Sequence, residues 1–468
     1  MLLRGFVMAG TRMNMTEGPL LKKLLIYALP VLATGVLQFL YNSADTIVVG
    51  RFAEDGETAL AAVGSTGSLT ALITGLFIGL AVGANVSISH AFGAGREDSV
   101  KDIVHTSVSL SFLLGIVISV FGFVTAPSLL GLMGVPETVI GKSVLYMRII
   151  FLGMPAQMAY NYGAAVLNAR GDTKHPFYFL LFSGAVNVCL NLFFVMVCNM
   201  DVAGVALATI ASQYLSAFLI LRLLTKFDDC CKLDIKHLYI RRDKLLKIIK
   251  IGVPAGIQGC LFSVSNVLIQ SSINSFGAPT MAGNTAAANI DGIIYIAMNS
   301  FYHAALAFTG QNAGALKYDR IKKICGMCTA MVVVFGVIIG GVCYLLGPQL
   351  LSLFGIEGSV ETSESMRVGM LRLTMLGLPY FLCGMMEVMS GMLRGLGASF
   401  VSATVSLLGS CALRVVWIYT VFEQYRQLEV LYFSYSATWI ITTLAHFTCF
   451  VIILSRRIKA AKKAEVDI

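Results

Sequence analysis

Apolar residues occur in long, almost uninterrupted runs along this chain, and short polar stretches separate the runs. An α-helix needs about 20 apolar residues to cross the hydrocarbon core of a bilayer, whereas a barrel strand shows about 10 residues of alternating character. The runs lie at 22–50, 59–87, 102–126, 143–167, 176–198, 203–225, 245–276, 281–308, 322–346, 366–392, 399–422 and 430–455. The sequence therefore predicts an all-α integral membrane protein with twelve transmembrane helices.

The composition and the charge pattern support a membrane protein with a defined orientation. Hydrophobic residues make up 57 % of the chain and charged residues 13 %, against about 25 % charged residues in a typical soluble domain. Lys and Arg concentrate in every second connection, most densely between Arg222 and Lys250, while the alternate connections carry acids such as Glu361 and Glu423. This positive-inside pattern predicts that both termini lie in the cytoplasm. It also explains the net charge of +9 without a nucleic-acid partner.

The two halves of the chain are built alike. With one constant spacing Pro30 falls on Pro254 and Arg148 falls on Arg372. Further pairs are Leu152, Gly153 and Pro155 with Leu376, Gly377 and Pro379, Leu167–Gly171 with Leu393–Gly397 after a slip of two residues, and Gly93–Gly95 with Asn312–Gly314. The predicted domains are a cytoplasmic N-terminal segment at 1–21, six-helix lobes at 22–225 and 245–455, a cytoplasmic linker at 226–244 and a basic tail at 456–468. Two parallel six-helix repeats are typical of a transporter whose substrate path runs between its lobes.

Three acidic residues, Asp45, Asp291 and Glu387, fall well inside predicted spans. A charge at the bilayer centre costs at least about 2.5–3.5 kcal/mol on insertion scales, so such residues are functional candidates by default. The polar neighbours of Asp45 in the sequence predict a hydrated pocket, in which an acid can exchange a proton or Na⁺ for a substrate. The alternative is a carboxylate capped by hydroxyl groups close to the membrane interface.

Other polar residues in the spans extend these candidate sites. Asn187 and Asn191 share one face of the fifth helix, and Thr209 lies on the sixth; facing Asp45, they would offer oxygen ligands to a cation or carry a proton relay. Ordinary hydrogen bonding between helices is the alternative for them.

In the second half, Asp291 and Glu387 are candidates for binding cationic substrate or protons, with Arg414 as an ion-pair partner for either. The alternative for each acid is neutralisation by such a partner or by protonation. Arg148 and Arg372 are expected to snorkel to the interface.

Several segments resemble the multidrug and toxic compound extrusion (MATE) family. They are Pro30–Arg51 with Ala44-Asp45-Thr46, Gly153-Met154-Pro155 followed by Arg170–Lys174, Leu393–Gly397, and Gly310-Gln311-Asn312-Ala313-Gly314-Ala315. The resemblance covers residues 18–455. It implies a two-lobed exporter of cationic or amphipathic compounds, driven by H⁺ or Na⁺ through alternating access.

The same resemblance implies roles for individual residues. Asp45 resembles the first-helix acid that binds the coupling ion, with Asn187, Asn191 and Thr209 as its neighbours. Asn191 stands where many members carry an aspartate, which argues against a mechanism with two carboxylates in this lobe. An acid early in the seventh helix is absent, and Gln258 and Asn266 are the polar groups there. These two residues, together with Asp291 and Glu387, are the predicted substrate cleft.

Three functions are candidates for such a membrane protein. An ion-coupled multidrug antiporter in the cell membrane fits all the features above, as a monomer without a cofactor or structural metal, and with H⁺ or Na⁺ at Asp45. A lipid or oligosaccharide-lipid flippase of the same larger superfamily should line its cleft with arginine or lysine, and only Arg148, Arg372 and Arg414 lie within the spans. A channel or an embedded enzyme is disfavoured because motifs such as H-E-x-x-H and G-x-S-x-G are absent from the sequence.

Overall fold

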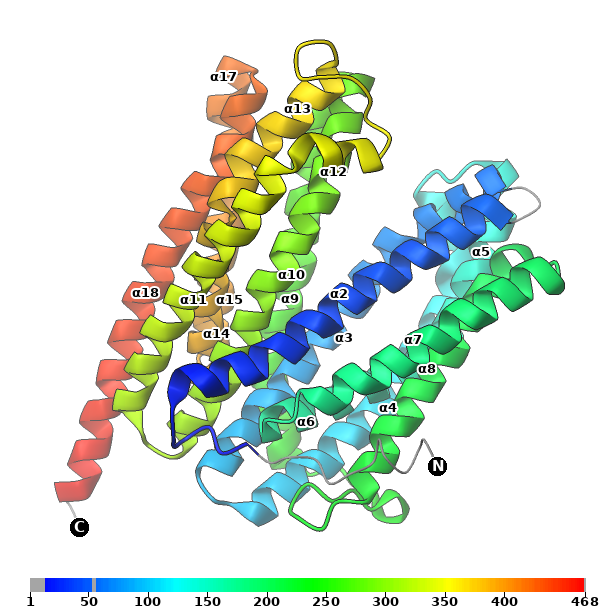
Figure 1. The fold of residues 1–468 in the computed structure, drawn as a ribbon. Coiled ribbons are helices and arrows are strands. Elements are labelled where there is room, and N and C mark those ends of the chain that lie inside the picture. Colours follow the sequence, from blue (N-terminus) through cyan, green and yellow to red (C-terminus); the bar gives the residue numbers. More distant parts are fainter. Residues whose placement is uncertain (1–12, 53–55, 467–468) are drawn as a thin grey trace. The chain divides into compact units, whose positions relative to one another are not determined.

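The computed structural model describes residues 13–52 and 56–466, and every regular element in this part of the chain is a helix (Figure 1). The first half contains α2 (Leu20–Phe52), α3 (Gly56–Gly93), α4 (Glu97–Leu132), α5 (Glu137–Leu152), α6 (Met154–Arg170), α7 (Lys174–Leu192), the π-helix η1 (Phe193–Val197) and α8 (Asp201–Thr225). The 3₁₀ turn η2 (Ile235–His237) lies in the connection to the second half. The predicted all-α fold is confirmed.

The second half is less regular because π-helical and 3₁₀ turns interrupt its later helices. It contains α9 (Arg242–Asn274), α10 (Ala278–Gly314), α11 (Tyr318–Leu345), α12 (Gly347–Leu353), α13 (Glu364–Arg372), η3 (Leu373–Gly377), η4 (Leu378–Tyr380), α14 (Phe381–Gly395), α15 (Ser399–Ser406), η5 (Leu407–Ala412), α16 (Leu413–Trp417), η6 (Ile418–Phe422), α17 (Glu423–Tyr425) and α18 (Leu428–Val466). The elements from α13 to α14 and from α15 to α17 each form one membrane span.

Ten helical segments in the described residues are long and apolar enough to cross a bilayer, and the bent pair of α5 and α6 makes an eleventh. α10 has 37 residues but carries polar side chains such as Asn284 and Asp291, which lower its hydropathy. With α10 included, the structure is consistent with the twelve predicted spans. The cytoplasmic placement of the termini stays a prediction.

The fourth predicted span, at 143–167, is bent by 45° between α5 and α6. Gly153 lies at the corner, where a Cβ atom would come within 2.5 Å of the Gln213 side chain of α8. Pro155 follows in the first turn of α6, a position that tolerates proline because its missing N–H would have no partner in the helix. The Gly-Met-Pro sequence therefore accounts for the bend.

Two compact units can be distinguished, and each is described by itself. Unit 1 consists of Ala33–Gly256 together with the residues before Met15, and unit 2 consists of Met15–Leu32 and Ile257–Ile468. The boundaries fall inside α2 and α9, so each of these helices begins in one unit and ends in the other. The two predicted lobes begin at residues 22 and 245, whereas in the structure the first part of α2 belongs to unit 2 and the first part of α9 belongs to unit 1.

The core of unit 1 lies mainly among α3, α4, α5, α6 and α8, with Tyr162, Phe151 and Ile88 fully buried in it. The first part of α9 packs on α3 at two glycines: a Cβ atom on Gly79 or Gly83 would lie within 2.3 Å of the α9 backbone. Gly75, the third member of the same stripe, has open space around it. Close helix packing therefore involves only part of the stripe.

Equivalent turns in the two halves share their backbone hydrogen bonds. Gly171 and Asp172 donate N–H groups to residues three and five positions back, and Gly397 and Ala398 do the same, as the predicted pairing of these segments requires. The turns after α3 and α10 also share one pattern, in which three successive N–H groups donate to residues four, three and five positions back. The donors are Ala94, Gly95 and Arg96 after α3, and Ala315, Leu316 and Lys317 after α10. The predicted pairing of Gly93–Gly95 with Asn312–Gly314 is therefore wrong by two residues.

Candidate functional site

Asp45 lies on the second part of α2, inside unit 1, within hydrogen-bonding distance of α7 and α8. Its Oδ1 accepts a hydrogen bond from Asn191 Nδ2 at 2.5 Å, and its Oδ2 lies 3.2 Å from Thr209 Oγ1. The second Nδ2 hydrogen of Asn191 is donated to Asn187 Oδ1 at 3.2 Å. The structure thus brings together the four residues that the sequence singled out for one site.

The packing of α2 against α7 explains how Asp45 reaches the asparagines. Tyr41 lies one turn before Asp45, and its ring occupies the space that a Cβ atom of Gly184 would fill. The Tyr41 hydroxyl also donates to the Leu181 carbonyl at 3.2 Å. Asn191 lies two turns after Gly184. The packing of Tyr41 against Gly184 therefore fixes the position of α2 along α7, and with it the contact between Asp45 and Asn191.

The polar cluster lies beside a local change of helix type. α7 ends at Leu192, directly after Asn191, and the π-helix η1 continues the chain. π-turns are rare and occur frequently at functional sites, because they rotate the following residues relative to the preceding helix. Val195 of this π-turn lies in a buried apolar cluster with Val48 of α2 and Val205 of α8.

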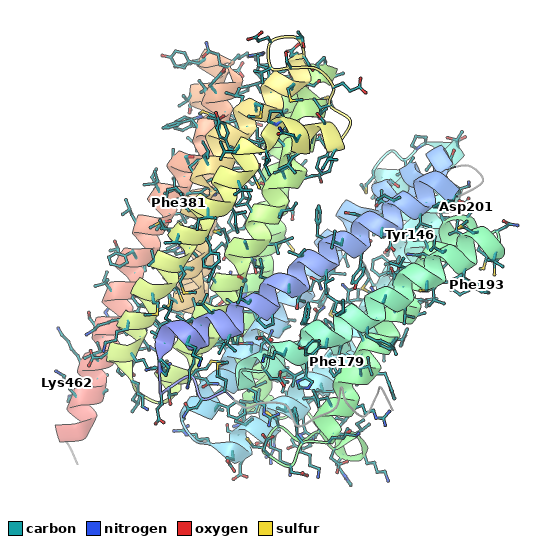
Figure 2. The ribbon with its side chains drawn as sticks, in the orientation of Figure 1. Tyr146, Phe179, Phe193, Asp201, Phe381 and Lys462 are labelled. Atoms are coloured by element: carbon teal, nitrogen blue, oxygen red, sulfur yellow. The ribbon has the colours of Figure 1, made fainter. Side chains whose placement is uncertain are left out.

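Figure 2 shows Tyr146 and Asp201 at the end of unit 1 toward which the second part of α2 runs. Tyr146 packs against the apolar cluster next to Asp45. Asp201 forms an ion pair with Lys142 at 2.6 Å, and both side chains are partly exposed. Asn187 and Asn191 are buried while Asp45 and Thr209 are partly exposed. Access to the site is therefore from the side of the carboxylate and the hydroxyl.

The hydroxyl of Thr209 can serve two forms of Asp45. It lies 2.9 Å from the Val205 carbonyl as well as 3.2 Å from the carboxylate, yet it has only one hydrogen to donate. When that hydrogen goes to Val205, a protonated Asp45 can donate to the hydroxyl oxygen. When Asp45 is ionised, the hydroxyl can turn and donate to the carboxylate. The arrangement accommodates both the loaded and the unloaded acid.

The oxygen atoms of the cluster suit a hard cation. They comprise the two carboxylate oxygens, the Thr209 hydroxyl and the amide oxygens of Asn187 and Asn191, and the Asn191 Oδ1 is buried without a hydrogen-bond partner. A buried acceptor without a partner is unfavourable unless a proton donor, water or cation satisfies it. The site can therefore hold either a proton on Asp45 or a small cation. The described residues contain no group of three or more His, Cys, Asp or Glu side chains arranged for a metal ion.

The second predicted site is not one cluster. Asp291 is buried in unit 2 and accepts from Arg372 Nε at 2.8 Å, while Arg372 also donates to Asn284 at 2.7 Å. Tyr432 donates to the same Asn284 oxygen at 3.0 Å. The expectation that Arg372 snorkels to the interface is wrong, because the carboxylate on α10 provides a buried partner within reach.

Gln258 has a buried partner that sequence reasoning missed. Its Oε1 accepts from Arg394 at 2.7 Å, and Arg394 also donates to the Tyr302 hydroxyl at 2.6 Å. Arg394 is buried at the end of α14. In the sequence it stands next to Gly395 at the edge of a predicted span, where a charge usually reaches water. The apolar run that continues almost to Arg394 is the sequence feature that could have indicated its burial.

The remaining predicted residues of unit 2 stand apart. Glu387 on α14 is partly exposed and has no hydrogen bond or salt bridge to the described residues, and Asn266 on α9 is exposed. Arg414 does not pair with either acid: its Nε donates to Thr438 at 3.1 Å and its guanidinium lies 4.2 Å from the centre of the Tyr435 ring. Among the described residues Glu387 thus forms no direct ion pair, in contrast to Asp291, although the charge of Arg394 acts on it.

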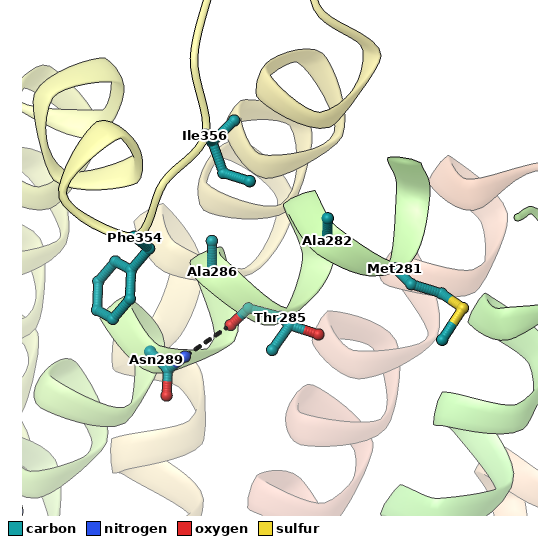
Figure 3. A pocket seen from close by; sticks show the side chains of 7 residues that line it. All are labelled: Met281, Ala282, Thr285, Ala286, Asn289, Phe354 and Ile356. Atoms are coloured by element: carbon teal, nitrogen blue, oxygen red, sulfur yellow. Dashed lines mark hydrogen bonds between the residues drawn. The ribbon is translucent and has the colours of Figure 1, made fainter. Parts of the chain in front are cut away.

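An open cavity of about 360 Å³ lies in unit 2 along one face of α10 (Figure 3). Its lining residues are Met281, Ala282, Thr285, Ala286, Asn289, Phe354 and Ile356. The Asn289 amide donates to the Thr285 carbonyl within α10 at 3.1 Å. The lining carries no titratable side chain and none of the predicted site residues.

Known proteins resemble this chain over most of its length. A family model described as MatE matches residues 30–193 and 254–420, one segment in each half. The chain is 29 % identical to a probable multidrug resistance protein, YoeA, of Bacillus subtilis, over 90 % of this chain and 91 % of the relative. It is 24 % identical to a FAD transporter of Shewanella oneidensis, over 75 % and 77 % of the two chains.

Solved structures of transporters share the fold. One is the outward-facing conformation of a multidrug resistance MATE family transporter of the MOP superfamily, with a TM-score of 0.88 and 21 % identity over 97 % of this chain and all of the other. Another, a MOP superfamily transporter from Pyrococcus furiosus, also has a TM-score of 0.88, at 20 % identity over 96 % of this chain and 99 % of the other. Because the family model covers well over half of the sequence, the chain belongs to the MatE family of MATE multidrug transporters and is a multi-pass protein of the cell membrane.

Proposed function

We propose that this protein is a secondary antiporter that exports cationic or amphipathic small molecules in exchange for H⁺ or Na⁺. The observation that carries the proposal is the cluster of Asp45, Asn187, Asn191 and Thr209 in unit 1. It combines one carboxylate with neutral oxygens in a partly exposed site inside a membrane-spanning unit. The names of the relatives, which include multidrug resistance proteins, support the same function.

Coupling follows from competition for the charge of Asp45. The ionised carboxylate attracts a cationic substrate, and a proton or Na⁺ neutralises the charge and removes that attraction. A ligand shifts a conformational equilibrium only by its difference in affinity for the two states. We propose that ion-loaded and ion-free Asp45 favour different states, so that ion entry is linked to substrate release by alternating access.

The neighbours of the buried arginines argue against a pyrophosphate-lipid flippase. Arg372 is neutralised by Asp291, Arg394 donates to Tyr302 and Gln258, and Arg414 donates to Thr438. Phosphate recognition requires guanidinium groups that can turn two donors to the ligand. Arg372 is thus committed to an ion pair, and Arg394 and Arg414 each donate to neutral side chains, which favours a small-molecule substrate.

The test is transport by the purified protein in proteoliposomes. Uptake of a fluorescent organic cation is measured under an imposed pH gradient and, separately, under an imposed Na⁺ gradient. FAD is included as an anionic substrate because one relative is named as its transporter. Asp45→Asn is compared with Asp201→Asn, which removes a partly exposed carboxylate of the same unit outside the cluster.

We expect one gradient to drive cation uptake, Asp45→Asn to abolish the gradient dependence, and Asp201→Asn to retain it. Full gradient-driven uptake by Asp45→Asn would show that another group carries the ion. Uptake of FAD without uptake of any cation would show that the substrates are anionic and that the proposed substrate class is wrong. If neither gradient moves any compound, the antiporter function is wrong.

A further inference from the structure

The chain segment before α2 is held by side chains of unit 2. Met15 is fully buried although it lies in an irregular turn. Its N–H donates to Gln311 Oε1 at 3.2 Å, and its carbonyl accepts from Asn312 Nδ2 at 3.1 Å and from Arg320 Nε at 3.2 Å. A buried backbone outside regular structure needs such partners, and here the side chains of α10 and α11 provide them.

Two cations extend these contacts over the next three residues. Arg320 donates to the carbonyl groups of Glu17 and Gly18 at 2.9 Å each, and Lys317 donates to the Thr16 carbonyl at 3.2 Å. Lys317 also pairs with the Glu17 carboxylate at 3.3 Å. We call Met15–Gly18 the anchor segment, and Gln311, Asn312, Lys317 and Arg320 the socket.

The socket is built around a strained turn between α10 and α11. Leu316 adopts a φ of 57°, in the left-handed region that side-chain-bearing residues rarely occupy, whereas its counterpart in the turn after α3 is Gly95. Strained backbone of this kind persists where the surrounding structure holds it, and it is concentrated at functional positions. Gln311 and Asn312 precede the turn and Lys317 follows it, so the turn brings socket residues from both helices together.

The start of the other crossing helix is held in a comparable way inside unit 1. Before α9, the Tyr239 ring stacks on His105 of α4 at 4.9 Å between centroids, and the Tyr239 hydroxyl donates to Asp102 at 2.9 Å. The Arg241 N–H donates to Thr106 at 3.1 Å. The segments that lead into both helices that begin in one unit and end in the other are therefore held by side chains of the unit in which the helix begins.

We propose that the anchor segment is an intramolecular ligand whose docking in the socket fixes the start of α2, and that Gln311, Asn312 and Arg320 are positioning residues for transport. α2 begins two residues after the anchor segment, in unit 2, and continues as one helix, which contains Pro30, to Asp45 in unit 1. Coupling between distant sites is carried by hydrogen-bond networks and secondary-structure elements that connect them, and α2 with its anchored start is such an element. The inference rests on the proposed function, because the anchor gives ion binding at Asp45 a mechanical connection to unit 2.

The test combines hydrogen exchange with transport in full-length protein reconstituted in lipid. Arg320→Gln removes the charged fork that binds three carbonyl groups, and Arg320→Lys retains the charge without the fork. Lys323→Gln on the same helix is the matched control, because it removes a cation outside the socket. Exchange of peptides covering residues 13–19 reports docking, while initial transport rate and the dissociation constant of a fluorescent cation report function.

In Arg320→Gln we expect exchange in residues 13–19 to rise by about tenfold or more, because a single net hydrogen bond already changes an equilibrium by roughly that factor. The transport rate should fall several-fold while the dissociation constant for substrate stays unchanged, Arg320→Lys should be intermediate, and Lys323→Gln should match the wild type. Unchanged exchange in Arg320→Gln would overturn the docking role of the socket. Raised exchange with a normal transport rate would overturn the positioning role.

Failure of the proposed function gives a different result. A wild-type protein that moves no substrate under any gradient refutes the antiporter and, with it, the positioning role. The exchange comparison between Arg320→Gln and Lys323→Gln still decides whether the socket holds the anchor segment.

Discussion

The amide nitrogen of Asn191 lies 2.5 Å from a carboxylate oxygen of Asp45 and donates its second hydrogen to Asn187. One asparagine therefore links the acid of α2 to the preceding turn of α7. It also holds its own oxygen buried beside the carboxylate without a partner. Asn191 thus contacts both Asp45 and Asn187, and its substitution should disturb the cluster most directly.

Asn191→Leu preserves the side-chain volume and removes both donors. It leaves the buried Asn187 oxygen without a partner, at a cost of about 1–3 kcal/mol, and removes one hydrogen bond of the Asp45 carboxylate. We expect a lower melting temperature and loss of gradient-driven transport. Gln349→Leu, which removes an exposed amide of α12 in unit 2, is the control and should change neither. Equal behaviour of the two variants would exclude a role for the Asn191 amide.

Thr209 offers a finer test of the hydroxyl. Thr209→Ser keeps the group that lies between the carboxylate and the Val205 carbonyl, and Thr209→Val replaces it with a methyl of nearly the same shape. We expect Ser to transport at close to the wild-type rate and Val to be about tenfold slower, since one hydrogen bond to a charged group is worth roughly 1.5–3 kcal/mol. A Val variant as fast as the Ser variant would show that the hydroxyl only caps the backbone of α8.

The ion pair of Asp291 and Arg372 predicts a coupled effect on stability. Removing one partner of a buried pair leaves an uncompensated charge, at a cost of about 3–5 kcal/mol, whereas replacing both partners by apolar residues is often neutral. Asp291→Leu and Arg372→Met should each lower the thermal stability strongly. The double variant should be more stable than either single variant. Additive losses in this double-mutant cycle would show that the two side chains act independently.

Two glycines of α3 predict opposite effects of the same substitution. A Cβ atom on Gly79 would lie 2.3 Å from the backbone nitrogen of Gly256, whereas a Cβ atom on Gly75 meets nothing within 4 Å. Gly75→Ala should raise thermal stability slightly, because alanine is favoured over glycine in a helix by about 1 kcal/mol. Gly79→Ala should lower it, because backbone atoms of α9 must move. A similar change in both variants would show that α9 does not pack on α3 in this way.

Cysteine labelling tests the predicted orientation. Cys198 is exposed in the turn before α8, and Cys231 is buried in the connection after α8. A hydrogen bond with Cys230, burial and the nearby Asp229 carboxylate raise the pKa of the Cys231 thiol. Because the thiolate is the reactive form, Cys231 should remain unmodified by maleimide at neutral pH.

An impermeant maleimide added to intact cells should modify Cys198, because the positive-inside pattern places this turn outside the cytoplasm. Peptide mass spectrometry identifies the modified residue. Modification of Cys198 only after the cells are opened would reverse the predicted orientation. Modification of Cys231 in the folded protein would contradict its burial.

The sequence by itself determined the fold class and the composition of the first site. Each span must satisfy its own backbone hydrogen bonds in lipid, so uninterrupted apolar runs predict helices whatever their neighbours are. The cost of a charge in the bilayer likewise identified Asp45 as a candidate site residue. The four-residue spacing of Asn187 and Asn191 predicted that both amides lie on one face of a helix. Local periodicity and the energetics of single side chains sufficed for these conclusions.

Only the tertiary structure decided which polar groups meet across helices. Arg372 pairs with Asp291 and Arg394 with Tyr302 and Gln258, and nothing in the local sequence around either arginine names these partners. The division of α2 and α9 between two units and the socket for Met15 depend in the same way on contacts between residues far apart in the chain. Such contacts are set by how the helices pack, which a one-dimensional pattern of apolar runs does not encode.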